Sequence, residues 1–426
     1  MIKLKGLRWW IIGLIGLATI INYIDRNALA VMWPDISKDL GMDKSDYANI
    51  VSIFMIAYAI SHTLSGKLYD WIGTRFGFVI SILVWSAGCM LHAIARGVLS
   101  FSIFRAILGL GEAGNWPGAT KSNAEWFPVK ERAFAQGIFG ASASVGAIIS
   151  APLIAILYLG FGWKMTFFIV GACGILWLVP WLFINKAGPE KHPWLSEEDR
   201  QYILNGQRPE PEESKEIKEN QVSGWGKLLT YRQTWAVLLA RFFIDPVWWL
   251  FLTWLPIYLA EQFGFNIKQI GLFAWVPYVG GAVGALTGGG IAGYFIGKGW
   301  GVNRSRKTTI IAGGLFMFIP LFFTAFAGSP LTAVLLIAII LFGFQFAMTN
   351  IQTLISDFYS GKAVGSVMGM SGTTSTLGVL IAIQLVPVIT KTSYVPFFIL
   401  AALVVPLGIL SVFLGGKVKR VDIKLN

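Results

Sequence analysis

Long apolar segments limit the possible folds of this chain more than any other feature. A helix that crosses a bilayer needs roughly 20 mostly apolar residues. Backbone polar groups in lipid must be bonded internally, so such segments fold as helices. Twelve segments qualify: 8–32, 46–66, 76–95, 99–124, 133–157, 163–185, 232–260, 268–296, 308–327, 331–355, 364–390 and 393–416. The sequence therefore predicts an all-α polytopic membrane protein with twelve transmembrane helices.

Composition and charge agree with a membrane setting. Of the 426 residues, 55% are hydrophobic and 13% are charged, whereas soluble domains carry about 25% charged residues. The net charge of +12 comes from basic residues in short connectors, where contact with anionic lipid and control of topology explain them better than nucleic acid does. Cys89 and Cys173 lie separately in apolar segments, so we expect neither a disulfide framework nor a metal site.

The apolar segments form two groups of six. We expect an N-terminal six-helix bundle at 1–187, a cytoplasmic linker with one surface helix at 188–230, and a C-terminal six-helix bundle at 231–426. Sixteen Lys and Arg residues fall in short connectors on the side of the N-terminus, against six on the other side. The positive-inside rule then places both termini in the cytoplasm of a multi-pass protein. We expect it to lie in the bacterial inner membrane and to function as a monomer.

An internal repeat relates the two halves. A shift of 232 residues pairs Glu125 with Asp357 and Gly140 with Gly372, and near the starts of the halves a shorter shift pairs Pro34 with Pro256. An insertion around 298–307 reconciles the two shifts. Parallel six-helix repeats are typical of transporters that bind substrate at the bilayer midplane, between their halves. The sequence thus predicts two pseudo-symmetric halves.

Two ionisable residues lie deep in the first apolar segment. Asp25 and Arg26 follow its start by about 17 residues, a rise of about 25 Å. Ionisable side chains are costly in hydrocarbon, so each is a functional candidate. The planar guanidinium of Arg26 suits a carboxylate. Neighbouring residues on a helix do not face each other, so we favour separate roles for the two over a neutralised structural pair.

A second ionisable set lies in the fourth apolar segment. Arg105 and Glu112 are seven residues apart, which places them on one helix face. Gly109, Gly111 and Gly114 allow a neighbouring helix to approach closely. Burial favours the protonated form of Glu112 until a cation or substrate changes the local field, as a proton carrier requires. The alternative is a structural hydrogen bond to another helix.

The second half offers further substrate-contact candidates. Arg241 and Asp245 are four residues apart and can pair, and both a substrate role and mutual neutralisation remain open. Trp248, Trp249 and Trp254 include candidates for a ring that stacks on a sugar, with no basis in sequence for choosing one. Several polar residues in apolar segments could bond sugar hydroxyls or merely bond across helices: Tyr23, Tyr58, Thr349, Gln352 and Thr374.

The loop after the second apolar segment has a recognisable pattern. It resembles the gate loop of the major facilitator superfamily at Gly66, Leu68, Asp70, Gly73 and Arg75. Trp71 stands where that pattern usually has Arg. The resemblance implies that Asp70 and Arg75 belong to a charge clasp on the cytoplasmic face, which stabilises one access state.

Other segments narrow the resemblance. Residues 25–27, 125–132, 241–246 and 251–256 are similar to the anion:cation symporter family, which includes bacterial hexuronate and galactonate transporters. The resemblance implies proton coupling at Asp25 and Glu112, near Arg105, and carboxylate binding at Arg26. It implies import of a monovalent sugar-acid anion without a cofactor, with H⁺ as the coupling ion and Na⁺ left open.

Other functions remain as alternatives. An aldonate or aldarate symporter, such as a galactonate transporter, is the nearest. An organic-phosphate exchanger would use Arg241 together with Arg26, whereas a drug–proton antiporter would have less use for Arg26. A membrane enzyme is not expected, because the sequence shows no nucleophile–base pair, metal-ligand set or phosphate loop.

Overall fold

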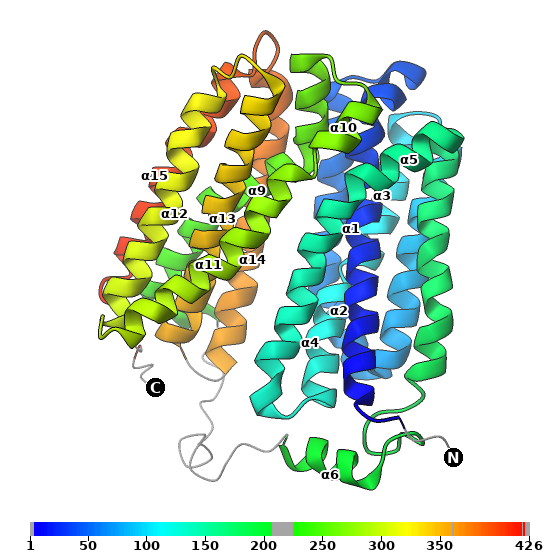
Figure 1. Ribbon diagram of the computed structural model, residues 1–426, viewed down its shortest axis with the longest axis vertical. Coiled ribbons are helices and arrows are strands. Elements are labelled where there is room, and N and C mark those ends of the chain that lie inside the picture. The colour runs from blue at the N-terminus through cyan, green and yellow to red at the C-terminus, as the bar shows by residue number, and fades with distance from the viewer. Residues whose placement is uncertain (1–3, 207–224, 360–361, 420, 422–426) are drawn as a thin grey trace. The chain divides into compact units, whose positions relative to one another are not determined.

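The computed structural model describes residues 4–206, 225–359, 362–419 and 421, and within these ranges all regular secondary structure is helical. The chain divides into two compact units, Met1–Glu216 and Ile217–Asn426. We call them the first and the second unit. Figure 1 shows each as a bundle of long helices, coloured from blue to green in the first and from green to red in the second.

The first helix, α1, is longer than its apolar segment. It spans Leu7–Leu40, begins after Gly6 and ends at Gly41, and both glycines have a left-handed backbone, with φ of 67° and 64°. The Gly41 N–H donates to the carbonyl of Ser37, a common way to end a helix. The predicted end at residue 32 is wrong because the polar turns that follow continue the helix beyond the apolar stretch.

Two helices each cover two of the predicted segments. Helix α2 (Lys44–Leu91) has 48 residues and helix α5 (Val129–Ile184) has 56. Each is interrupted at one glycine: Gly73 has φ 75° and ψ 169°, and Gly162 has φ 72° and ψ 172°. Only glycine adopts such angles without strain. The breaks fall between the paired segments 46–66 with 76–95 and 133–157 with 163–185.

The remaining elements of the first unit are short. They are η1 (His92–Ile94), α3 (Val98–Glu112), α4 (Asn115–Trp126) and α6 (Glu197–Gly206). Helix α2 packs mainly on α3, and α1 packs mainly on α5. A Cβ atom on Gly109 of α3 would lie 2.7 Å from the carbonyl oxygen of Phe54 on α2. The close helix approach predicted for this glycine is therefore confirmed.

Helix α6 lies in the predicted linker and packs on the first unit. Arg8, at the start of α1, donates from Nε to Glu131 Oε2 at 2.9 Å. Tyr202 on α6 donates its hydroxyl to Glu131 Oε1 at 2.7 Å. Ile203 of the same helix is fully buried. The part of the linker that ends with α6 is thus held against the first unit by both polar and apolar contacts.

The second unit repeats the long-helix plan. Its elements are α8 (Trp225–Leu228), α9 (Arg232–Phe263), α10 (Ile267–Phe273), α11 (Val276–Gly297), α12 (Val302–Thr324), α13 (Pro330–Phe358), α14 (Lys362–Ile389) and α15 (Val395–Leu414). Helix α13 packs on α11 and α12, while α9 packs on α14 and α15. A Cβ atom on Gly288 of α11 would lie 2.5 Å from the carbonyl oxygen of Phe346 on α13, so small residues permit this contact.

Several helices are suited to lipid. In the described part of the chain, nine have the length and hydropathy of a membrane span. Helices α3 and α4 have 15 and 12 residues, because a turn at 113–114 divides the predicted segment 99–124. The protein is a multi-pass membrane protein, while the count of twelve spans remains a prediction.

Candidate functional site

A buried ion pair joins two helices of the first unit. Arg26 on α1 donates from Nε and from Nη2 to Glu112 Oε2 on α3, at 2.9 and 2.8 Å. The side chain of Arg26 is 6% exposed and that of Glu112 is 0% exposed. Two N–H donors on one carboxylate oxygen form a strong, charge-assisted contact. Oε1 of Glu112 has no hydrogen-bond partner in the described residues.

The Arg26 guanidinium is held in a polar and aromatic setting. Its Nη2 also donates to Asn22 Oδ1, one turn earlier on α1, at 3.2 Å. Its Cζ lies 5.2 Å from the ring centroids of Tyr23 and Tyr58 and 5.5 Å from that of Phe54. Such distances fit cation–π attraction. Sequence reasoning missed Asn22 and Phe54 as members, although each precedes a predicted site residue by one helical turn.

Asp25 and Arg105 are two further buried ionisable residues of the same unit. Asp25 is fully buried, and the thiol of Cys89 on α2 lies beside its carboxylate. Arg105 donates from Nη1 to the carbonyl of Arg26 at 3.3 Å, while its Nε and Nη2 have no acceptor among the described residues. Burying a charge without a partner is costly. The first unit thus gathers five predicted residues around Arg26: Tyr23, Asp25, Tyr58, Arg105 and Glu112.

The second unit has its own arginine–carboxylate pair, on α9. Arg241 contacts Asp245 Oδ2 from Nε at 3.0 Å and from Nη2 at 2.9 Å. Its Nη1 donates to Ser371 Oγ on α14 at 2.9 Å. The pairing predicted from the four-residue spacing is therefore confirmed. Asp245 already neutralises Arg241 within one helix.

Three predicted sugar contacts are not gathered around Arg241. Thr349 and Thr374 donate to carbonyls one turn back in their own helices, those of Gln345 and Met370, at 2.9 Å each. Gln352 is exposed on α13. Thr374 follows Ser371 by one turn of α14, and Ser371 is the residue that accepts the hydrogen bond from Arg241. A substrate role for these residues stays a prediction.

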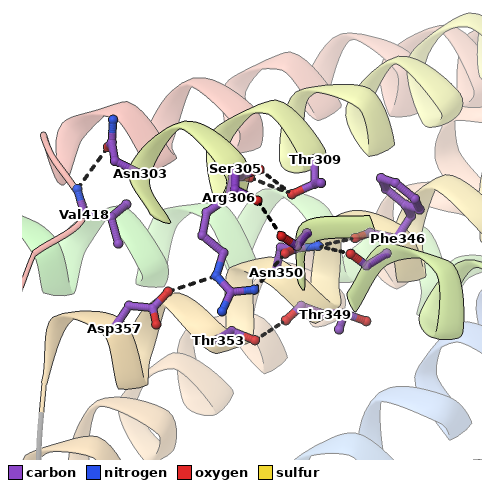
Figure 2. A network of polar contacts seen from close by, with 12 residues as sticks. Asn303, Ser305, Arg306, Thr309, Phe346, Thr349, Asn350, Thr353, Asp357 and Val418 are labelled. Carbon is purple, nitrogen blue, oxygen red and sulfur yellow. Dashed lines mark hydrogen bonds and ion pairs between the residues drawn. The ribbon is translucent and has the colours of Figure 1, made fainter. Parts of the chain in front are cut away.

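An interhelical ion pair also lies in the second unit, and sequence reasoning missed it. Figure 2 shows Arg306 of α12 between two partners on α13, with Asp357 Oδ2 at 2.9 Å from Nε and Asn350 Oδ1 at 3.1 Å from Nη1. In the first unit Thr74 donates to Glu125 at 2.8 Å. Both contacts join residues 51 apart. The 232-residue repeat that pairs Glu125 with Asp357 was the signal that could have found Arg306.

The predicted gate residues are only partly described. The side chain of Asp70 lies outside the described side chains. Arg75 donates to the carbonyls of Lys186 and Leu182, at the end of α5, and its own carbonyl accepts from Trp181 Nε1 at 3.0 Å. Arg75 therefore ties the helix that follows Gly73 to the end of α5. A clasp that includes Asp70 remains a prediction.

Comparison with known proteins gives the family and close relatives. The Major Facilitator Superfamily model matches residues 15–383. The chain is 32% identical over 414 residues to the hexuronate transporter of Escherichia coli (strain K12), covering 96% of this chain and 94% of that protein. It is 34% identical over 322 residues to the galacturonate transporter of Dickeya chrysanthemi, covering 75% and 92%.

A solved structure shares the fold. The D-xylose-proton symporter superposes with a TM-score of 0.72 at 16% identity and covers 97% of this chain and 98% of that one. At this identity the similarity concerns the fold alone. The all-helical architecture predicted from the sequence is thereby confirmed.

Proposed function

Because the chain belongs to the Major Facilitator Superfamily, we propose that it imports a monovalent sugar-acid anion together with protons. A hexuronate such as glucuronate or galacturonate is the substrate we favour, by analogy with the hexuronate and galacturonate transporters that it resembles. We place it in the bacterial inner membrane as a monomer, with both termini in the cytoplasm.

The Arg26–Glu112 pair carries the proposal. A permanent cation within a membrane helix is costly, which makes Arg26 a candidate for a functional role. Its guanidinium group is bonded to a titratable acid on another helix. Because the two side chains are paired, protonation of Glu112 and binding of a substrate carboxylate to Arg26 favour each other. A proton on Glu112 removes the negative charge that Arg26 binds, and the guanidinium then accepts a carboxylate from the substrate.

The surrounding residues complete the proposed binding site. The rings of Tyr23 and Tyr58 flank the guanidinium, and we propose that their hydroxyls bond sugar hydroxyls beside the carboxylate. Asp25 is a second buried acid in the same unit, and we propose that it is the second proton carrier, with Arg105 tuning the local field. Arg241, Thr349, Gln352 and Thr374 are proposed substrate contacts on the second unit, and Asp70 with Arg75 the gate.

The membrane potential explains why coupling is needed. An inside-negative potential opposes entry of a monovalent anion by roughly 2.3 kcal/mol per 100 mV. One co-transported proton cancels the charge movement, so that only the pH gradient drives uptake. Two protons, one on each acid, make the uptake electrogenic. Alternating exposure of the site to the two sides of the membrane completes the cycle.

A phosphate-ester exchanger is the second candidate. The presence of a second arginine, Arg241, supports this function, because phosphate binding favours several guanidinium groups. The pairing of Arg241 with Asp245 speaks against it, because the acid occupies the donors that a phosphate would need.

Proteoliposome uptake tests the proposal. Purified protein is reconstituted, and uptake of labelled glucuronate, galacturonate and galactonate is measured with and without an inward proton gradient. We expect accumulation of at least one hexuronate above its outside concentration only when the gradient is present. Preference for galactonate would assign the aldonate alternative. Exchange of a phosphate ester for phosphate, without uptake of any sugar acid, would overturn the proposal.

A further inference from the structure

Basic side chains gather around a turn at the end of α15. Gly416 of this turn has φ 71°, and a Cβ atom there would lie 2.7 Å from Nη2 of Arg232, the first residue of α9. The guanidinium of Arg232 therefore lies directly against the turn. Lys307 of α12 donates from Nζ to the carbonyl of Gly416 at 2.6 Å. Asn303, one turn earlier on α12, accepts from the backbone N–H of Val418 at 3.0 Å (Figure 2). The turn thus brings cations of two helices together.

A third cation lies one turn before Lys307 on α12. Cζ of Arg304 lies 4.1 Å from the ring centroid of Trp300, a distance that fits cation–π attraction. Trp300 in turn stacks on Phe295 of α11, with 4.4 Å between ring centroids and 12° between planes. This contact holds the guanidinium by its face, so its N–H donors are left for other partners. Trp300, Arg304 and Lys307 all lie in the segment 298–307, where the internal repeat needs an insertion.

The three cations lack an acidic partner in the described part of the chain. No carboxylate there forms an ion pair with Arg232, Arg304 or Lys307. The first unit differs at the start of its own first long helix, since Arg8 of α1 donates to Glu131 Oε2 at 2.9 Å. Like charges without a counter-ion repel one another. This end of the second unit is therefore a region of positive potential that favours an anion.

Exposed apolar side chains continue from the cations along two helices. The ring of Phe413 on α15 lies 4.8 Å from Nζ of Lys307 and is 43% exposed. Leu410 and Leu414 of α15 are also exposed, and so is Ile311, one turn beyond Lys307 on α12. In a multi-pass membrane protein such a surface contacts acyl chains. The cations thus lie at the end of an apolar face, where lipid headgroups meet the helix ends.

We propose that Arg232, Arg304 and Lys307 bind the phosphodiester group of an anionic phospholipid, whose acyl chains lie along the exposed faces of α12 and α15. Basic pockets between transmembrane helices bind such headgroups through charge attraction. Lys307 uses one of its three ammonium hydrogens on Gly416 and keeps two for the ligand. A free phosphate has the same charged group but would make no use of the apolar face, so a lipid fits both features. The inference does not depend on which substrate is transported.

The test measures lipid binding to the purified full-length protein in detergent by native mass spectrometry. Titration with phosphatidylglycerol is compared with titration with phosphatidylcholine of the same acyl chains. Each cation near a lipid headgroup contributes roughly fivefold in affinity, so phosphatidylglycerol should bind at least about tenfold more tightly. Arg232→Gln/Arg304→Gln should weaken binding of phosphatidylglycerol about 30-fold and leave binding of phosphatidylcholine unchanged. Lys307 is kept, because it also ties α12 to the end of α15.

Lys268→Gln/Lys391→Gln is the matched control. It removes the same charge from two exposed lysines that lie beyond the C-terminal ends of α9 and α14, and it should change the affinity less than about twofold. Arg304→Gln alone covers the case in which the double variant does not fold, with an expected loss of about fivefold. Equal binding of the two lipids, an unchanged affinity in a folded arginine variant, or the same loss in the control would overturn the inference. Binding of inorganic phosphate alone, with the same dependence on Arg232 and Arg304, would assign the site to a free anion and overturn the lipid proposal.

Discussion

Each of the two units contains a buried or partly buried arginine–carboxylate pair, but one pair joins two helices and the other lies within a single helix. Arg26 and Glu112 are 86 residues apart and join α1 to α3, with side chains 6% and 0% exposed. Arg241 and Asp245 are four residues apart on α9, with side chains 14% and 7% exposed. The pair within one helix survives any shift of that helix against its neighbours. Only the pair between helices can link a protonation event to helix packing.

The two pairs should differ most in transport when the carboxylate of each is replaced by an amide. A pH gradient of about one unit drives roughly tenfold accumulation for each coupled proton. We expect Glu112→Gln to lose this accumulation while retaining exchange of pre-loaded substrate, because the amide keeps the size of the side chain but cannot carry a proton. Asp245→Asn should keep pH-driven accumulation. The measurement is uptake and counterflow in proteoliposomes, and intact accumulation by Glu112→Gln would break the comparison.

A smaller difference is expected when each arginine becomes lysine. Lysine keeps the charge but loses the planar fork, and one charge-assisted hydrogen bond contributes about 1.5–3 kcal/mol. Arg26→Lys should therefore raise the KM for the sugar acid about 10- to 100-fold. Arg241→Lys should raise it less than about threefold, because Asp245 still neutralises the cation. Equal effects in transport kinetics would show that both arginines bind the substrate carboxylate.

The two units also differ in one repeated contact, Thr74–Glu125 in the first and Arg306–Asp357 in the second, and we expect the two contacts to contribute differently to stability. Arg306 is 15% exposed and Asp357 is 21% exposed, and Arg306 also bonds Asn350 (Figure 2). Removing one partner of a partly buried pair leaves the other charge poorly solvated. Arg306→Gln should lower the free energy of unfolding by about 1–3 kcal/mol, and Thr74→Val by about 0.5–1.5 kcal/mol. Thermal unfolding in detergent measures both, and the reverse order would contradict the assignment.

The smallest effect concerns His192, beside the end of α5. Burial lowers the pKa of His192, and the ring is neutral, with Nε2 donating to the Ile184 carbonyl at 2.8 Å and Nδ1 accepting from the Trp194 N–H at 3.2 Å. A histidine with a lowered pKa stabilises the docked linker fully above about pH 6.5, and this contribution is lost as the pH falls below that value. Amide protection in 197–206, corrected for the intrinsic pH dependence of hydrogen exchange, should therefore decrease between pH 7.5 and 5.5.

His192→Gln separates this local effect from transport. Glutamine does not titrate, so the amide protection of α6, corrected for intrinsic exchange, should no longer change with pH, while the pH profile of uptake stays unchanged. If the pH profile of uptake shifted in this variant, the group that senses protons would be in the linker and not Glu112.

The sequence predicted the helical class and the family well, since lipid requires long apolar helices whatever the packing. It did not predict helix ends such as Leu40, because polar turns continue a helix once it leaves the apolar stretch. Glycine alone did not reveal that Gly73 and Gly162 take a positive φ and interrupt long helices, because most glycines of the chain pack within helices.

The site was predicted unevenly for a physical reason. Arg26 and Glu112 stand out in sequence because charge in hydrocarbon is rare. Their partners do not, since Phe54 and Asn22 are ordinary residues for a buried helix face, and only packing brings them to the guanidinium. Arg306 resembled one more loop cation until its contact with Asp357 on α13 was seen.

Proton uptake on substrate binding tests the central claim most directly. Purified protein in weakly buffered detergent solution near pH 7.5 is mixed with glucuronate, and a pH-sensitive dye records the protons taken up. Wild-type protein should take up protons as the sugar acid displaces Glu112 from Arg26, and Glu112→Gln should bind the same anion with measurably fewer. Equal proton uptake by the two proteins would contradict the account.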